Sequence, residues 1–253
     1  MKRKKRKIIA GILIAQMAGL IIFSGVKLLQ YLDEKAQVEE QFDTLSRMTD
    51  TERSSREDKE QADGNRLKRY QKIYEQNPDF IGWLRIEGTN INYPVMQSGT
   101  DDPEFYLDHD FNKDYSVYGV PFADAACKIG ESNNVILYGH HMTSETMFHE
   151  ITYYEDPEFL KDHKRILFDT LGSEDEYEVI AVFRFDTDHE SFRFNRYTDM
   201  DMKTFAEFMK CVHERELYNT GLDAVFGEKL LTLSTCDYVY NNGRFVVVAK
   251  EVD

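Results

Sequence analysis

Cysteine is scarce in this chain: its 253 residues include only three, Cys127, Cys211 and Cys236. An odd, scattered set of three cannot form the disulfide framework of a small secreted scaffold, so at least one thiol should be free. The rest of the composition is ordinary, with 42% hydrophobic and 30% charged residues. This composition disfavours disordered, collagen-like and multi-span membrane proteins, and the length suits one domain with additional segments.

The sequence also lacks the short motifs that bind metals and phosphates. It has no zinc-ligand spacing and no glycine-rich phosphate loop. It contains no Asp-x-Asp-x-Asp-Gly run, so Asp101, Asp102, Asp108 and Asp110 are better explained as solvated turn residues than as a calcium site. We therefore expect no metal and no cofactor.

Acidic residues are missing from residues 1–27, which hold seven of the 31 lysines and arginines. Residues 28–253 consequently carry 24 basic and 46 acidic side chains, a net charge of −22. A polypeptide this acidic repels polyanions. We expect no nucleic-acid partner.

The N-terminal segment has the pattern of a membrane anchor. A basic tail, residues 1–7, precedes 19 uncharged residues, 8–26. About 20 apolar residues in a helix span a hydrocarbon core of about 30 Å, whereas the apolar region of a signal peptide is shorter, about 7–15 residues. An uncleaved single-pass anchor is therefore favoured over a cleaved signal peptide. The positive-inside rule places residues 1–7 in the cytoplasm and the remainder outside the cell.

Residues 27–76 are polar and contain no proline, which predicts a solvated, partly helical stalk. Within it, residues 66–76 place apolar side chains on one helical face, so this helix should pack on the domain that follows. Asn77-Pro78 ends the helix, because a residue before proline avoids the α region. We predict a folded domain over residues 77–253.

The pattern of this domain predicts a mainly β fold. Short strands are expected at residues 81–86, 91–96, 134–138, 165–169, 176–185, 229–234 and 244–250. One amphipathic helix is expected between the late strands, at residues 201–217. Many short strands with few helices indicate a closed or nearly closed β-barrel.

Cys236 is the most informative of the three cysteines. It ends an apolar strand, and Arg244 opens the next strand eight residues later, so a hairpin should bring the two residues together. A neighbouring guanidinium favours the nucleophilic thiolate and can bind an oxyanion. The same residues would also fit a buried core thiol with an unrelated surface arginine.

An acid/base partner must come from the seven histidines. His140 lies two residues after an apolar strand, at its end, and His141 beside it should point to the other side of the chain. The position of His140 at a strand end favours it over His141, and both histidines stay candidates.

These motifs resemble those of sortases. Residues 232–236, TLSTC, followed by Arg244 resemble the T-L-x-T-C…R signature, although a spacing of eight residues is at the short end for the family. Residues 137–142, LYGHHM, resemble the histidine motif of class B. The resemblance continues in the same order through residues 81–84, 89–95, 104–107, 119–124 and 146–148.

The resemblance implies an eight-stranded sortase β-barrel with N-terminal helices and an inserted helix near 201–217. It further implies a membrane-anchored cysteine transpeptidase of a Gram-positive type of cell. Such an enzyme cleaves an Asn-Pro-x-Thr-like C-terminal sorting signal of secreted surface proteins through a cysteine thioester. An amine of a peptidoglycan precursor, or of a pilin, then resolves the thioester.

Carried over by position, Cys236 is the nucleophile, His140 the acid/base and Arg244 the stabiliser of the oxyanion or substrate. The implied substrate-binding residues are Leu107, Tyr138, Phe192, Ser234 and Thr235. Two alternatives remain at this point: a pilin-polymerising sortase, and a catalytically silent, membrane-tethered binding module.

Overall fold

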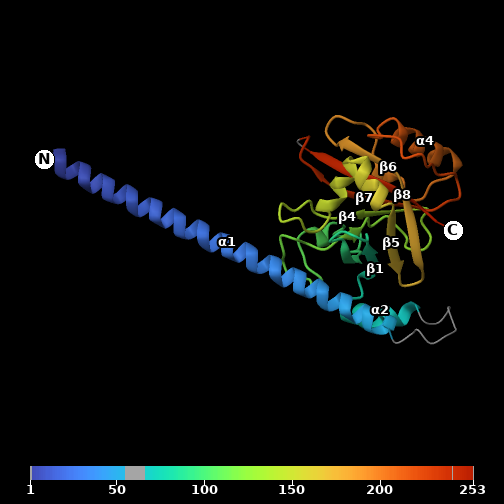
Figure 1. Cartoon of the computed structure of the whole chain (residues 1–253), viewed down its shortest axis with the longest axis horizontal. Coiled ribbons are helices and arrows are strands. Elements are labelled where there is room, and N and C mark those ends of the chain that lie inside the picture. Colours follow the sequence, from blue (N-terminus) through green and yellow to red (C-terminus); the bar gives the residue numbers. More distant parts are fainter. Residues whose placement is uncertain (1, 55–65, 241, 253) are drawn as a thin grey trace. The chain divides into compact units, whose positions relative to one another are not determined.

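The computed structural model describes residues 2–54, 66–240 and 242–252. Among these residues, the strands are β1 (Phe80–Arg85), β2 (Asn92–Met96), β3 (Phe122–Ala123), β4 (Asn134–Tyr138), β5 (Arg165–Thr170), β6 (Glu174–Asp186), β7 (Leu230–Asp237) and β8 (Gly243–Glu251). They close into a barrel in the order β1-β2-β3-β4-β7-β8-β6-β5, which confirms the predicted barrel. Figure 1 shows β4, β6, β7 and β8 in this strand-rich domain.

The barrel mixes two kinds of strand pairing. β2 pairs with β3, and β4 with β7, in parallel, and the other neighbours are antiparallel. All seven strands expected from the sequence are present. β3 was not predicted, because two residues are too few to show an alternating pattern. β7 ends at Asp237 and includes Cys236, in agreement with the prediction that Cys236 lies at the end of this strand.

Helix α4 (Met202–His213) is the inserted helix between the late strands. The side chain of Asp201 caps it by accepting a hydrogen bond from the Thr204 backbone N–H at 2.8 Å. Its apolar face, which includes Phe208 and Val212, is buried in the core. The helix is shorter than the predicted 201–217, because the chain then turns to pair with β6: the Leu217 N–H donates to the Val182 carbonyl.

The remaining short helices lie in the connections between strands. They are α3 (Pro157–Asp162) and the 3₁₀ helices η1 (Phe105–Leu107), η2 (His149–Glu155) and η3 (Phe194–Arg196).

The N-terminal helix α1 (Lys2–Ser54) begins in a unit of its own, which comprises residues 1–41. This unit contains the 19 uncharged residues, 8–26, and α1 is long and apolar enough to cross a membrane. Length and composition therefore make α1 a candidate membrane span.

The second compact unit starts at Phe42, so part of the predicted stalk packs on the barrel. The Phe42 ring lies 5.2 Å from the Tyr93 ring, and Asn92 Nδ2 donates to Ser46 Oγ. Helix α2 (Arg66–Gln76) has the predicted bounds and contacts β1. The central part of the predicted stalk, residues 55–65, lies outside the described residues.

Asn77, directly after α2, connects this helix to the loop that carries η1. Its buried Nδ2 donates to the Tyr106 hydroxyl at 2.9 Å and to the Phe111 carbonyl at 2.8 Å. Its Oδ1 accepts from the Asp79 N–H. A buried amide with three partners fixes the start of the 105–118 loop, and this loop reaches the cleft described below.

We predict that Asn77→Ala lowers the free energy of unfolding by about 1–3 kcal/mol, because it leaves buried polar groups without partners. Asn112, an exposed residue of the same loop, supplies the matched control, since Asn112→Ala should change stability by less than about 0.5 kcal/mol. Chemical denaturation of both variants measures this difference. Equal stabilities would show that the Asn77 network does not hold the loop.

Candidate active site

Two parallel strands bring His140 and Cys236 to one edge of the barrel. β4 and β7 pair in parallel, and their last paired residues are Tyr138 and Ser234. His140 and Cys236 each lie two residues beyond this pair. Because parallel strands run in the same direction, both residues lie at the same edge of the barrel.

Arg244 reaches this edge through the β7–β8 hairpin. The two strands are antiparallel, and Cys236 pairs with Arg244 in the register. The sequence-based expectation that these residues are neighbours is thereby confirmed. Directly opposed residues of an antiparallel pair project to the same face, which places the thiol and the guanidinium on one side of the sheet.

All three side chains line one cleft of about 610 Å³. Of the five expected substrate-binding residues, four also line it: Leu107, Tyr138, Ser234 and Thr235. The cleft is therefore continuous from the thiol to the side chains that the sequence analysis assigned to substrate binding.

Phe192, the fifth expected substrate-binding residue, is not among the residues that line the cleft. It is buried in the core, where its ring lies 6.1 Å from that of Phe208 and 4.9 Å from the Arg215 guanidinium carbon. Its neighbours Arg193 and Asn195 line the cleft instead. The structure therefore does not bring Phe192 together with the other four residues, although Phe194 of the same loop lines the cleft.

The orientation of His140 follows from its hydrogen bond to the 105–118 loop. His140 Nε2 lies 2.6 Å from the Leu107 carbonyl oxygen. A carbonyl oxygen can only accept, so Nε2 must carry the hydrogen. In the neutral ring, Nδ1 is then the nitrogen that can take up a proton.

Glycine is required immediately before His140. A Cβ on Gly139 would lie 2.6 Å from the Phe148 ring, which is fully buried against it. The Phe148 N–H in turn donates to the His140 carbonyl at 2.8 Å. This close packing fixes the backbone that carries the His140 imidazole.

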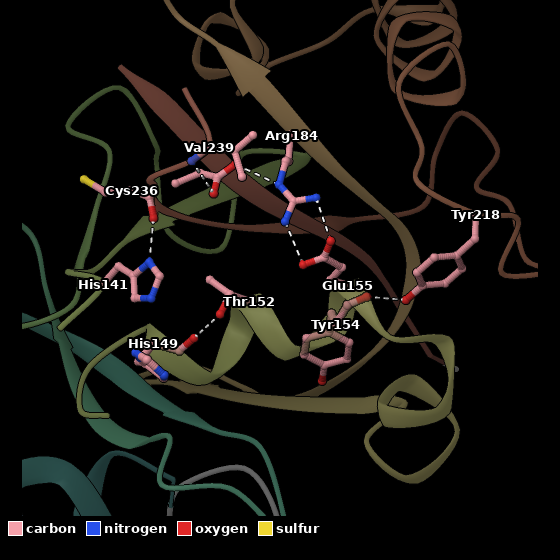
Figure 2. Close-up of polar contacts among 10 residues, drawn as sticks. His141, His149, Thr152, Tyr154, Glu155, Arg184, Tyr218, Cys236 and Val239 are labelled. Atoms are coloured by element: carbon pink, nitrogen blue, oxygen red, sulfur yellow. Dashed lines mark hydrogen bonds and ion pairs between the residues drawn. The ribbon is translucent and has the colours of Figure 1, made fainter. Parts of the chain in front are cut away.

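His141 points away from the cleft, as expected from the sequence. Its Nδ1 lies 2.9 Å from the Cys236 carbonyl oxygen, while the sulfur of Cys236 points away from the imidazole (Figure 2). Burial lowers the pKa of His141, and the nearby His149 lowers it further, although the hydrogen bond to Cys236 opposes this shift. His141 therefore contacts the backbone of Cys236 and not its thiol.

Arg244 has no carboxylate partner within ion-pair distance among the described residues. The one hydrogen bond found there for its guanidinium runs from Nη1 to the Gly243 carbonyl at 2.9 Å. By contrast, Arg184 is neutralised by Glu155 and Asp237. Arg244 thus retains N–H groups and a positive charge that can act on a bound group.

The three cysteines differ in their surroundings. Cys127 is buried, and burial raises the pKa of its thiol to about 12. Cys211, on α4, packs beside the hydrophobic core. Cys236 lines the cleft and is partly exposed. A thiol, an imidazole with a free nitrogen and an unpaired guanidinium in one cleft can support attack on a carbonyl carbon.

Sequence reasoning did not assign several polar residues of the cleft. Asp124 accepts a hydrogen bond from the Tyr138 hydroxyl at 2.8 Å and lines the cleft, as does Glu104. These residues lie in loops between strands, and no local pattern shows that such loops meet. Only the barrel topology brings them to the same edge.

The comparisons with known proteins agree on one family. The family model for the sortase domain matches residues 84–252. Sortase B of Staphylococcus aureus is 31% identical over 184 residues, which are 72% of this chain and 73% of that protein. Sortase B of Listeria monocytogenes is 31% identical over 182 residues, 70% of this chain and 71% of that protein. A structure of an S. aureus sortase B-substrate complex superposes with a TM-score of 0.75 at 26% identity, covering 87% of this chain and 98% of that one.

The unequal surroundings of the thiols predict selective labelling. A methanethiosulfonate reagent should modify Cys236 in the folded protein and leave Cys127 unmodified, because the reactive species is the thiolate and burial keeps Cys127 protonated. Cys211 should also stay unmodified. Peptide mapping by mass spectrometry identifies the labelled site, with Cys236→Ser as the control. An inert Cys236, or faster labelling of Cys127, would contradict this assignment.

Proposed function

This chain belongs to the sortase family, with class B members as its relatives, and on that premise we propose that it uses Cys236 to cleave a C-terminal sorting signal of secreted proteins. Class B sortases are cysteine transpeptidases, so the cleaved protein is passed to an amine. The observation that carries the proposal is the common cleft of Cys236, His140 and Arg244.

In the first step, the Cys236 thiolate attacks the carbonyl carbon of the scissile peptide bond. The negative charge that develops on the carbonyl oxygen is stabilised by the Arg244 guanidinium, whose N–H groups have no carboxylate competitor among the described residues. The C–N bond then breaks. The leaving amine takes a proton from the His140 imidazolium, and a thioester remains on Cys236.

In the second step, an acceptor amine attacks the thioester carbonyl. His140 accepts the proton that the amine releases, and the C–S bond breaks to regenerate the thiolate. The Leu107 carbonyl holds Nε2, so His140 carries this proton on Nδ1. The products are a new amide and the free enzyme.

The sorting signal that we propose is Asn-Pro-x-Thr-like, as the class B resemblance implies. Leu107, Tyr138, Ser234 and Thr235 would contact it, since all four line the cleft. We do not retain Phe192, because it is not among the residues that line the cleft. A related sortase B has been captured in a substrate complex, which supports a peptide-binding role for the corresponding cleft.

We further propose that residues 8–26 anchor the protein in the cell membrane as a single-pass helix. The basic residues 1–7 would lie in the cytoplasm and the catalytic domain, residues 77–253, outside the cell. The support is the uncharged stretch within α1 together with the charge asymmetry of the chain. In this arrangement the substrates are secreted surface proteins, and the acceptor is an amine of a peptidoglycan precursor.

Three substitutions test the proposed roles in the cleavage of an Asn-Pro-x-Thr peptide. Cys236→Ala should abolish cleavage, because it removes the nucleophile. His140→Ala should lose nearly as much activity, because the leaving amine needs a proton. Arg244→Lys should slow the reaction by about 10²–10³-fold, because lysine keeps the charge but loses the planar set of donors.

Cleavage rates measured across pH 6–9 provide the comparison, with His163→Ala as a control, since His163 does not line the cleft. Near-wild-type activity of Arg244→Lys would remove Arg244 from the proposed mechanism. Full activity of His140→Ala, combined with loss in His141→Ala, would show that the acid/base assignment is wrong. Retained activity of Cys236→Ala would contradict the proposed function as a whole. A pilin-type lysine peptide that outcompetes a cell-wall amine as acceptor would instead identify a pilin polymerase.

A further inference from the structure

The regular pairing of β4 and β7 stops before the candidate catalytic residues. The last paired residues are Tyr138 and Ser234, and the following residues are connected by other hydrogen bonds. The Gly139 N–H donates to the Ser234 carbonyl at 3.2 Å, and Thr235 Oγ1 donates to the Gly139 carbonyl at 2.7 Å. The two segments therefore stay together beyond the end of the ladder.

His141 and Tyr238 add a reciprocal pair of hydrogen bonds. His141 Nδ1 donates to the Cys236 carbonyl at 2.9 Å, and the Tyr238 hydroxyl donates to the His141 carbonyl at 2.9 Å. Since both acceptors are carbonyl oxygens, His141 Nδ1 must carry a hydrogen. Two hydrogen bonds, one donated from each segment, thus connect residues 140–141, which include the candidate acid/base, to residues 236–238, which include the candidate nucleophile.

Aromatic neighbours hold the His141 ring in this orientation. Its centroid lies 4.8 Å from the His149 ring and 4.8 Å from the Tyr238 ring. His149 is fixed in turn, because its Nδ1 donates to the Met142 carbonyl at 2.8 Å. Figure 2 shows the His141 imidazole beneath the Cys236 carbonyl, on the side opposite the sulfur. The imidazole therefore cannot exchange a proton with the thiol in this arrangement.

The next residue, Asp237, is held independently. Arg184 Nε donates to Asp237 Oδ2 at 2.8 Å, and the same guanidinium binds both carboxylate oxygens of Glu155 (Figure 2). Side-chain hydrogen bonds thus hold three consecutive residues at the end of β7, namely Thr235, Cys236 and Asp237. Beyond them the hairpin becomes exposed, with Val239 63% exposed. These anchors separate Cys236 from the exposed end of the hairpin.

Nucleophilic attack requires the sulfur within about 3–3.5 Å of the carbonyl carbon, and a displacement of 1 Å can cost about 10²-fold in rate. We propose that His141 is a positioning residue, which holds the Cys236 backbone through Nδ1 and so keeps the thiol at a fixed position relative to the His140 imidazole. This inference rests on the proposed function, since it assumes that Cys236 and His140 react together.

Three substitutions at one position test the inference. His141→Ala should lower kcat about 10- to 10²-fold with little change in KM, because the thiol is displaced while the peptide-binding surface remains. His141→Asn should recover most of kcat, since its Nδ2 occupies the place of Nδ1 on the imidazole. His141→Gln should stay impaired, because its amide projects one bond farther from the backbone.

His163→Ala is the matched control. His163 makes the same type of bond, from Nδ1 to the Phe159 carbonyl at 2.9 Å, but does not line the cleft. The His163→Ala variant should have a lower thermal stability but an unchanged kcat. Tyr238→Phe removes only a hydroxyl and should lower kcat to a smaller extent than His141→Ala, so it tests the contact even if the alanine variant folds poorly.

Wild-type kcat in both His141→Ala and Tyr238→Phe would overturn the inference. Equal kcat values for the asparagine and glutamine variants would also overturn it. Such a result would mean that the position of the donor does not matter, whereas the proposed hydrogen bond requires a donor at the place of Nδ1. Cys236→Ala, assayed in parallel, distinguishes failure of the positioning role of His141 from failure of the proposed function. If it is inactive while every His141 variant is normal, only the positioning role fails, whereas an active Cys236→Ala would contradict the proposed function itself.

Discussion

The parallel pairing of β4 with β7 is the constraint on which the candidate site depends. Gly139 and Thr235 are 96 residues apart in the chain, yet they lie in contact because these two strands run side by side. The equal offset of His140 and Cys236 from the last paired residues follows from this register. A shift of one residue would turn one of the two side chains to the opposite face of the sheet.

The other parts of the site are arranged around this pair of strands. The β7–β8 hairpin supplies Arg244 opposite Cys236, and the 105–118 loop supplies the Leu107 carbonyl that orients His140. Asn77 anchors that loop through Tyr106. The geometry of the candidate site thus draws on three separate connections of the barrel. Such preorganisation lets polar groups act on developing charge without first having to rearrange.

What could be predicted from the sequence depends on how local each signal is. The strands and the Cys236–Arg244 neighbourhood were predictable, because alternation and a short hairpin are encoded in consecutive residues. The two-residue strand β3 and the end of α4 at His213 were not, because long-range pairing determines them. Phe192 was assigned to the cleft through a loosely matching loop, and the structure places it in the core cluster and not in the cleft lining. The contact of His141 with the Cys236 carbonyl has no signature in the sequence at all.

We propose that Cys236 carries the acyl group during turnover. Mass spectrometry of the intact protein, quenched in acid during reaction with an Asn-Pro-x-Thr peptide, tests this proposal. We expect a mass increase equal to the acyl part of the peptide, located by proteolytic mapping on Cys236 and removed by hydroxylamine. An adduct on Cys127 or Cys211, or cleavage by attack of water with Cys236 unmodified throughout, would contradict it.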